Sequence, residues 1–237
     1  VDQSQEFERD KPATIILRLV GLCTLLSESG QGDEAIPVCR QAEQMAAEKL
    51  GERHQLYSAA LNNLGSALNT AGRFGEAIPI LRETLRARQL SLGERNIDTA
   101  ISIRNLAHAL QATGHPEESE SLNLQAAEIV APQRLKAQAN VYQTILGALA
   151  MNAAARQDWK TYDERMAATL AEADARMDDA NPERAFSHLQ HANVLEQRGR
   201  LSEAREIAER WVPVLRQRLI PGHRNRVWGE LLLARLR

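Results

Sequence analysis

The sequence repeats itself with a period of 42 residues. Gly30, Gly72 and Gly114 stand 42 residues apart, and the first two open the near-identical words GQGDEAIP and GRFGEAIP. Gln157 and Gly199 follow after 43 and 42 residues, so five anchor positions are almost evenly spaced. A period of this length is typical of proteins assembled from copies of one supersecondary unit. A single unit cannot bury its apolar face alone, so the repeat predicts about five stacked neighbours.

The segment upstream of each anchor has the pattern of an amphipathic helix. In the second copy it places Leu61, Leu64, Gly65 and Leu68 at the spacing that gathers side chains on one helical face. The glycine at the anchor then ends this helix, because glycine accepts the left-handed conformation at a helix C-terminus. Each copy therefore begins with a helix of about four turns.

A second helix follows each anchor, for example over residues 76–92. It ends at another glycine. A further set of equivalent positions lies 24 residues after four of the anchors. Asparagine is a strong helix N-cap, so the next first helix is expected to begin at this set. Its members are His54, Asn96, Asn181 and His223.

Composition and charge narrow the class of protein. The chain has 43% hydrophobic and 25% charged residues, as folded proteins do. Its 29 Lys+Arg against 31 Asp+Glu argue against a nucleic-acid binder. No segment reads as a membrane span or a secretion signal. Two cysteines suit a reducing compartment, so a cytoplasmic location is expected. The start at Val1 indicates a piece of a longer protein.

One family shares this pattern. The series Leu61, Leu64, Gly65, Leu68, Gly72, Phe74 and Ala77 resembles the tetratricopeptide repeat, a helix-turn-helix motif. The 42-residue period and the words LGERH and LGERN, at 50–54 and 92–96, resemble the longer variant found in kinesin light chains and many bacterial regulatory proteins. The resemblance implies an all-α fold, a right-handed α-solenoid of about five such repeats with a C-terminal capping helix.

The period also sets the expected boundaries. Residues 1–13 are expected to form an N-terminal extension or linker, 14–223 the repeats and 224–237 the capping helix. The expected repeats are 14–53, 54–95, 96–138, 139–180 and 181–223. Tyr162 stands where a close-contact alanine belongs, and His188 and His191 replace apolar positions of the fifth copy. Irregular packing or a shifted register is expected there.

In this family the first helices line the concave side, and the resemblance implies which residues face that groove. An Asn side chain offers a donor and an acceptor that match an extended peptide backbone, and Asn63 and Asn105 hold the same place in adjacent copies. The alternative is that these amides are solvated surface. The expected partner-binding residues are Asn62, Asn63, Ser66, Asn69, Arg104, Asn105, His108, Gln111, Met151, Phe186, Gln190 and Asn193.

Other side chains could carry chemistry. His188 and His191 are three apart on one helix, a spacing that metal ligands use, but no third ligand or HExxH word accompanies them. They are interpreted as a partly buried pair or a local register change, and no metal is expected. Cys23 and Cys39 fall at core positions of the first copy and are expected to be reduced, buried fillers.

A second group of side chains has a plain structural reading. Glu117, Glu118 and Glu120 begin a second helix, where the helix dipole favours acids. The groove lacks the Lys and Arg set that clamps a carboxylate in chaperone-binding relatives, which disfavours a chaperone adaptor.

These observations favour a non-enzymatic scaffold whose groove recognises an extended peptide or a partner surface. No phosphate-binding loop, nucleophile elbow or dinucleotide fingerprint is present, so neither catalytic residues nor a cofactor is expected. The alternative is a regulatory or sensor module of a larger bacterial signalling protein, a kinase or transcription regulator, that binds its own catalytic domain or an effector. The expected partners are proteins or peptides, not nucleic acid or membrane. The uncapped edge around Ile15, Ile16 and Leu19 is expected to be covered either by a segment missing from this sequence or by a second copy of the chain, which would give a homodimer.

Overall fold

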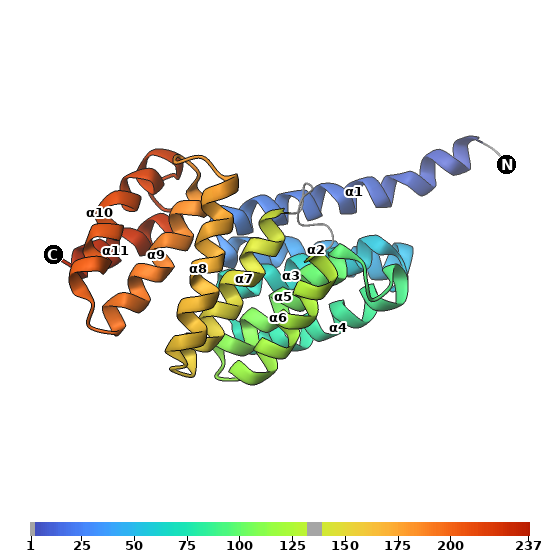
Figure 1. Ribbon diagram of the computed structural model, residues 1–237. Coiled ribbons are helices and arrows are strands. Elements are labelled where there is room, and N and C mark those ends of the chain that lie inside the picture. The colour runs from blue at the N-terminus through green and yellow to red at the C-terminus, as the bar shows by residue number, and fades with distance from the viewer. Residues whose placement is uncertain (1–2, 132–138) are drawn as a thin grey trace. The chain divides into compact units, whose positions relative to one another are not determined.

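The computed structural model describes residues 3–131 and 139–237, and across them it holds eleven α-helices and no strand (Figure 1). This confirms the predicted all-α, helical-repeat fold. Within these ranges no helix has the length and apolar character needed to cross a membrane. The helices are α1 (Gln3–Glu28), α2 (Gly32–Leu50), α3 (Gln55–Thr70), α4 (Phe74–Leu92), α5 (Ile97–Ala112), α6 (Pro116–Val130), α7 (Ala139–Ala155), α8 (Trp159–Arg176), α9 (Pro182–Gln197), α10 (Leu201–Arg218) and α11 (Arg224–Arg235).

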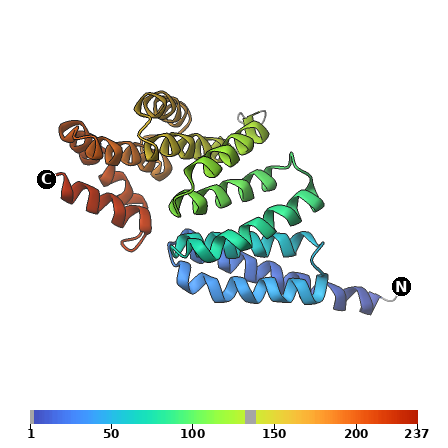
Figure 2. The ribbon, with the colours of Figure 1, turned by 90° about the horizontal axis from the view of Figure 1, so that it is seen from below.

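The chain divides into two compact units, Val1–Val141 and Tyr142–Arg237. In the first unit α1 and α2, α3 and α4, and α5 and α6 form three helical hairpins (Figure 2). Neighbouring hairpins join through α2 against α3 and α4 against α5, and the first helices α1, α3 and α5 also touch in succession. Each hairpin thus buries its apolar faces against its sequence neighbours, as the repeat predicts.

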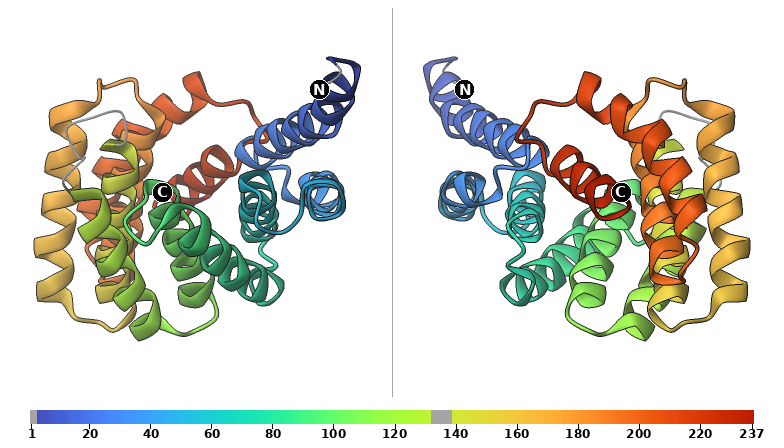
Figure 3. Two further views of the ribbon diagram at one scale, coloured as in Figure 1. Left: turned by 90° about the vertical axis from the view of Figure 1, so that its right-hand side faces the viewer. Right: turned by 90° about the vertical axis from the view of Figure 1, so that its left-hand side faces the viewer.

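The second unit continues the same order of contacts. Helices α8, α9, α10 and α11 pack in succession, and α11 also touches α9 (Figure 3). The last helix buries Leu232, Leu233 and Leu236 in a cluster with Trp211 and Leu215 of α10. It is therefore the first helix of a sixth copy that closes the core of this unit, which confirms the predicted capping helix.

The five anchors share one backbone conformation. Gly30, Gly72, Gly114 and Gly199 have φ between 72° and 85°, and Gln157 has φ of 59°. A non-glycine residue rarely adopts positive φ, because its Cβ crowds the backbone. Gln157 nevertheless does so, since the turn between α7 and α8 is the same turn that glycine makes in the other copies. The prediction that Gln157 takes the place of a glycine anchor is confirmed.

The predicted helix starts are confirmed in atomic detail. The side chains of Asn96 and Asn181 each accept a hydrogen bond from the backbone N–H two residues further on. In His54 and His223 the ring Nδ1 accepts the equivalent bond, at 3.1 Å and 3.2 Å. Histidine thus acts here as an N-cap in place of asparagine, and all four residues immediately precede the first residue of a first helix.

Two of the predicted boundaries can be compared with the helices as follows. Helix α1 already begins at Gln3, so the described part of the expected extension 1–13 continues the first helix through Pro12. The expected boundary at residue 138, between the third and fourth copies, falls outside the described residues.

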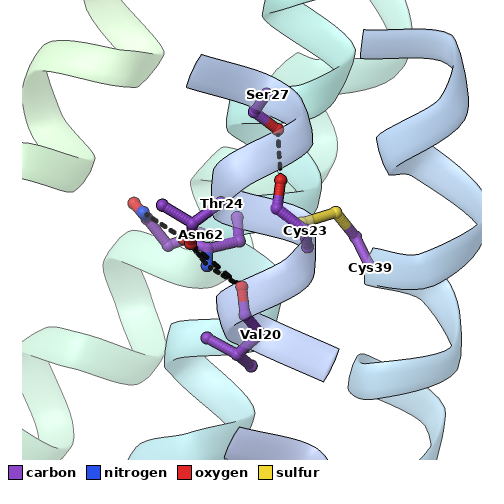
Figure 4. Close-up of a disulfide and its surroundings, with 7 residues drawn as sticks. Val20, Cys23, Thr24, Ser27, Cys39 and Asn62 are labelled. Atoms are coloured by element: carbon purple, nitrogen blue, oxygen red, sulfur yellow. Dashed lines mark hydrogen bonds between the residues drawn. A yellow bond between two sulfur atoms is a disulfide. The ribbon is translucent and has the colours of Figure 1, made fainter. Parts of the chain in front are cut away.

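One pair of equivalent positions joins the two helices in the core of the first and second hairpins. In the second hairpin a Cβ added to Gly65 would lie 2.4 Å from Cδ2 of Leu81, so Leu81 fills the space that glycine leaves. The same two places in the first hairpin, 42 residues earlier, hold Cys23 and Cys39. These two side chains are fully buried and joined by a disulfide (Figure 4). Their predicted core position is confirmed, whereas the prediction that they are reduced is wrong for this structure.

Candidate functional site

The first helices of the first unit present one accessible side, which we call the first-helix face. Its α1 part is open and partly apolar, because Leu17 and Gly21 are exposed. Its α3 and α5 parts are polar and mostly half-buried. The first-helix face comprises Leu17, Gly21, Asn63, Ser66, Thr70, Arg104, His108 and Gln111.

A chain of side-chain hydrogen bonds runs beneath this face from α1 to α5. Nδ2 of Asn63 donates to Oγ1 of Thr24 at 2.8 Å and to the Val20 carbonyl at 3.4 Å. Nδ2 of Asn62 donates to Oδ1 of Asn63 at 3.4 Å, and Nδ2 of Asn105 donates to Oδ1 of Asn62 at 3.3 Å. Amides of neighbouring copies thus connect the three first helices to one another.

Burial and bonding show what these amides do. Asn62 and Asn105 are each 7% exposed, and Asn69 is likewise buried. Nδ2 of Asn69 donates to the Asn105 carbonyl at 3.0 Å, again between α3 and α5. Buried amides that donate hydrogen bonds between neighbouring helices hold the stack together. Of the predicted first-unit residues, Asn63, Ser66, Arg104, His108 and Gln111 therefore keep surface that a partner can reach.

A buried arginine that was not predicted from the sequence belongs to this network. Arg88 of α4 is 7% exposed, and its Nη1 donates to the Asp98 carbonyl, to Oγ of Ser102 at 2.9 Å and to Oδ1 of Asn62 at 3.4 Å. Burial lowers the pKa of the Arg88 guanidinium, while the nearby Asp98 carboxylate opposes that shift. The repeat indicates that position 88 is a buried position, because the equivalent residues 42 positions away, Ala46 and Val130, are apolar and fully buried.

Two side chains give the α5 part of the first-helix face its shape. The exposed ring of His108 meets the edge of Phe74 of α4, with centroids 5.6 Å apart. Nη2 of Arg104 donates to Oδ1 of Asn105 at 2.8 Å, which anchors the guanidinium over the amide chain. The face is therefore held from below by packed and hydrogen-bonded groups.

In the second unit the predicted residues are largely engaged by other helices. Phe186 of α9 meets Trp228 of α11 edge to face at 5.5 Å, and Oδ1 of Asn193 accepts from Nη2 of Arg235 at 3.1 Å. Met151 packs against the small core between α7 and α8, and Gln190 is half-buried. Helix α11 thus covers much of the α9 side chains that were expected to bind a partner.

The two histidines of the fifth copy have separate partners. His188 lies flat on Trp211, with ring centroids 4.4 Å apart, and its Nε2 is 2.9 Å from Oδ1 of Asp174. Nδ1 of His191 is hydrogen-bonded to the Tyr162 hydroxyl at 2.8 Å. The two departures from the repeat, Tyr162 and His191, therefore compensate each other. In the stretches 3–131 and 139–237 no group of three His, Cys, Asp or Glu side chains is placed to hold a metal ion.

We expect these histidines to make the second unit sensitive to acid. Burial lowers the pKa of His188, with Asp174 opposing and Arg184 and Arg210 reinforcing the shift. Burial likewise lowers the pKa of His191. Between the lowered folded-state pKa and the unfolded value of about 6.5, the unfolded chain binds more protons than the folded chain. The contribution of these two histidines to stability is therefore fully present above about pH 6.5 and is lost as the pH falls through their lowered pKa values.

We expect urea unfolding of the second unit to occur at lower denaturant at pH 5.5 than at pH 7.5. Tryptophan fluorescence follows this unit selectively, because all three tryptophans, Trp159, Trp211 and Trp228, belong to it. The double variant His188→Gln with His191→Gln should show a smaller change between the two pH values. An equal change in the variant would mean that other groups cause the acid sensitivity.

Comparisons with known proteins agree with the helical-repeat architecture. A tetratricopeptide repeat family model matches residues 14–89 and 58–131, and a second tetratricopeptide repeat model matches residues 185–210. Together these matches cover more than half of the chain. No curated protein matches the sequence.

Several solved structures share the fold. A kinesin-light-chain-like protein of Podosopora anserina with nearly identical repeats has a TM-score of 0.66 at 21% identity, over 87% of this chain and 96% of that chain. BtubC (BKLC) from P. vanneervenii has a TM-score of 0.60 at 16% identity, over 93% and 82% of the two chains. A Rap protein complexed with Competence and Sporulation Factor has a TM-score of 0.66 at 14% identity, over 96% and 64%. At these identities the likeness concerns the fold.

Proposed function

Because the chain belongs to the tetratricopeptide repeat family, we propose that it is a non-enzymatic protein-interaction scaffold whose first-helix face binds an extended segment of a partner. The observation that carries this proposal is the contrast between two sets of polar groups on the same helices. Asn62, Asn69 and Asn105 are buried and hold the helices together, whereas Ser66 and His108 stand above them with accessible surface.

Such an arrangement favours binding because the surface is ordered in advance. The hydrogen-bond chain from Thr24 to Asn105 fixes the spacing of α1, α3 and α5. Binding to a preorganised surface costs less ordering entropy than binding to a loose one. The partner then meets side chains whose positions are already set by the repeat.

The chemistry of the face indicates what kind of segment it takes. Asn63, Ser66 and Gln111 offer donors and acceptors for peptide groups, and Leu17 offers an apolar contact at the α1 end. Arg104 is the charged member of the face, and it is anchored on Asn105. A largely uncharged, extended peptide fits this surface better than an acidic one.

We expect the double variant His108→Ala with Gln111→Ala to weaken peptide binding by about tenfold, the scale of one or two lost hydrogen bonds. The probes are linear peptides selected on the wild-type chain from a displayed random library, and calorimetry measures their affinity. Because few charges line the face, affinity should change little between low and physiological salt.

The matched control for that experiment lies on a second helix. Arg86 of α4 is exposed and outside the first-helix face, so Arg86→Ala should leave the affinity unchanged. Failure to select any peptide, or equal losses in the control and the double variant, would reject the first-helix face as the binding site.

The second candidate function is a regulatory or sensor module of a larger bacterial signalling protein. Its support is that a Rap protein complexed with Competence and Sporulation Factor has the same fold over 96% of this chain. There the first-helix face would bind a catalytic domain of the parent protein or an effector. The full gene tests this candidate, because an attached kinase or DNA-binding domain would favour it over a free-standing scaffold.

The compartment is proposed from the two cysteines. A cytoplasmic location requires that the Cys23–Cys39 disulfide be shielded from the thiols that keep cytosolic cysteines reduced. Both side chains are fully buried in the first hairpin, which provides that shielding. We therefore propose a cytoplasmic protein that carries one buried disulfide.

A further inference from the structure

Helix α1 has an apolar side that is largely exposed in the described part of the chain. Ile15, Leu22 and Leu25 are 46%, 47% and 66% exposed. Arg18 lies between them on the same side and is also exposed. These four residues define the α1 outer face. Ile16, which the sequence analysis placed at this edge, is instead fully buried with Ala46 and Leu61.

The repeat shows that this side of a first helix is normally a helix-packing surface. Moving the four residues forward by 42 gives Tyr57, Ala60, Leu64 and Ala67 of α3, which are all buried. In α3 this side packs with α2, the second helix of the preceding hairpin. Moving them by 84 gives four buried positions of α5 as well, namely Thr99, Ser102, Leu106 and Ala109. The α1 outer face is therefore the continuation of an interface that the fold uses twice.

The side chains do not suit another repeat stacked in the same way. Arg18 and Leu25 stand where α3 has Ala60 and Ala67. Helix α2 comes so close to α3 there that a Cβ added to Gly32 would lie 2.9 Å from the Ala67 carbonyl oxygen and 2.5 Å from the Ala71 nitrogen. A leucine and an arginine at these places hold a neighbouring helix further away. A helix at that distance packs as in a coiled coil rather than as in the repeat stack.

The spacing of the four residues indicates which helix that is. Ile15, Arg18, Leu22 and Leu25 are separated by three, four and three residues, a series that is the same in both directions. Two copies of α1 that run antiparallel therefore align all four positions at once. Each Ile15 meets Leu25 of the other copy, and each Leu22 meets the aliphatic stem of Arg18, whose guanidinium reaches water. Such a self-complementary patch gives a closed two-fold contact.

We propose that the α1 outer face is a homodimer interface in which two copies of α1 pack antiparallel. This goes beyond peptide binding, because none of the four residues of the α1 outer face belongs to the first-helix face. Dimerisation buries the three exposed apolar side chains without requiring a partner of different sequence.

The first test measures the mass of the full 237-residue chain by sedimentation equilibrium over a range of concentrations. The wild-type chain should reach the mass of a dimer, and Leu25→Glu should raise the dimer Kd by at least about tenfold. The matched control is Leu90→Glu, because Leu90 of α4 is 80% exposed in the same unit and outside the interface. It should dimerise as the wild type does.

A second measurement tests the antiparallel packing of the two α1 helices. It does not depend on whether the Leu25→Glu variant folds. A chain with Ile15→Cys is mixed with a chain with Leu25→Cys and treated with a short bismaleimide under non-reducing conditions, where Cys23 and Cys39 remain paired. The mixture should give cross-linked dimers more readily than either chain alone. A monomer at all concentrations, a dimer unaffected by Leu25→Glu, or preferred Ile15→Cys self-linking would overturn the proposal.

Discussion

Replacing Leu81 by alanine is expected to lower the free energy of unfolding of the first unit by about 2–5 kcal/mol. Leu81 of α4 is fully buried in the main core of this unit, where it fills the space beside Gly65. Glycine cannot move to close the cavity, since it has no side chain. The loss therefore comprises both the transfer energy of the removed carbons and the cost of the cavity.

The same substitution at Leu90 is the matched control. Leu90 lies on the same helix but is 80% exposed, so Leu90→Ala should change the stability by less than about 0.5 kcal/mol. Urea unfolding by circular dichroism gives the energies, and hydrogen exchange with mass spectrometry locates the loss. Protection should fall in α3 and α4. Equal effects of the two variants would show that Leu81 does not occupy the core.

Removing the disulfide is expected to destabilise the first hairpin by about 3 kcal/mol, as for a closed loop of about 15 residues. Cys23 and Cys39 are 16 residues apart in sequence and join α1 to α2. Without the bond the unfolded chain gains conformational freedom, while the folded hairpin keeps its helix contacts. The double variant Cys23→Ala with Cys39→Ala, compared with the wild type in urea, measures the difference.

A reductant provides the control for this experiment. It should destabilise the wild-type chain by a similar amount and leave the double-alanine variant unchanged. Alkylation of the native chain before reduction gives an independent reading. If both cysteines were alkylated without reduction, the disulfide would be absent from the purified protein, and the expectation would fail.

The turns and helix starts could be predicted because each depends on a residue and its nearest neighbours. A positive φ at an anchor follows from the position of that residue in the repeat, and even Gln157 obeys it. An asparagine or histidine before a helix needs only the backbone N–H two residues further on. Local chemistry of this kind is repeated with the period, so five anchors and four helix starts support these predictions.

The role of the amides could not be predicted in the same way. Asn63 and Asn105 share a register position, yet Asn105 is buried and bonded to Asn62, whereas Asn63 reaches Thr24 on the preceding helix. Which group fills a hydrogen-bonding site depends on the distance between helices and on the neighbouring side chains. The period places an amide on a helix face, but it does not say whether water, a ligand or another amide satisfies it.

Departures from the repeat were visible in the sequence, but their pairing was not. Tyr162 and His191 looked like two separate irregularities of different copies. In the structure they form one hydrogen bond, and their rings stack with centroids 5.9 Å apart. Likewise the register placed Cys23 and Cys39 in the core, but the approach of their sulfur atoms depends on the packing of α1 on α2. Which departures from the repeat contact each other depends on how the helices of different copies pack.

The place that the disulfide occupies recurs in the next hairpins with different chemistry. Cys23 and Cys39 correspond to Gly65 and Leu81, and again to Ala107 and Asn123. In a linear array each hairpin contacts only its neighbours, so a substitution at one such place affects mainly the stability of that hairpin. Loss of the disulfide would thus weaken the N-terminal hairpin first, and unfolding would proceed from that hairpin to its neighbours.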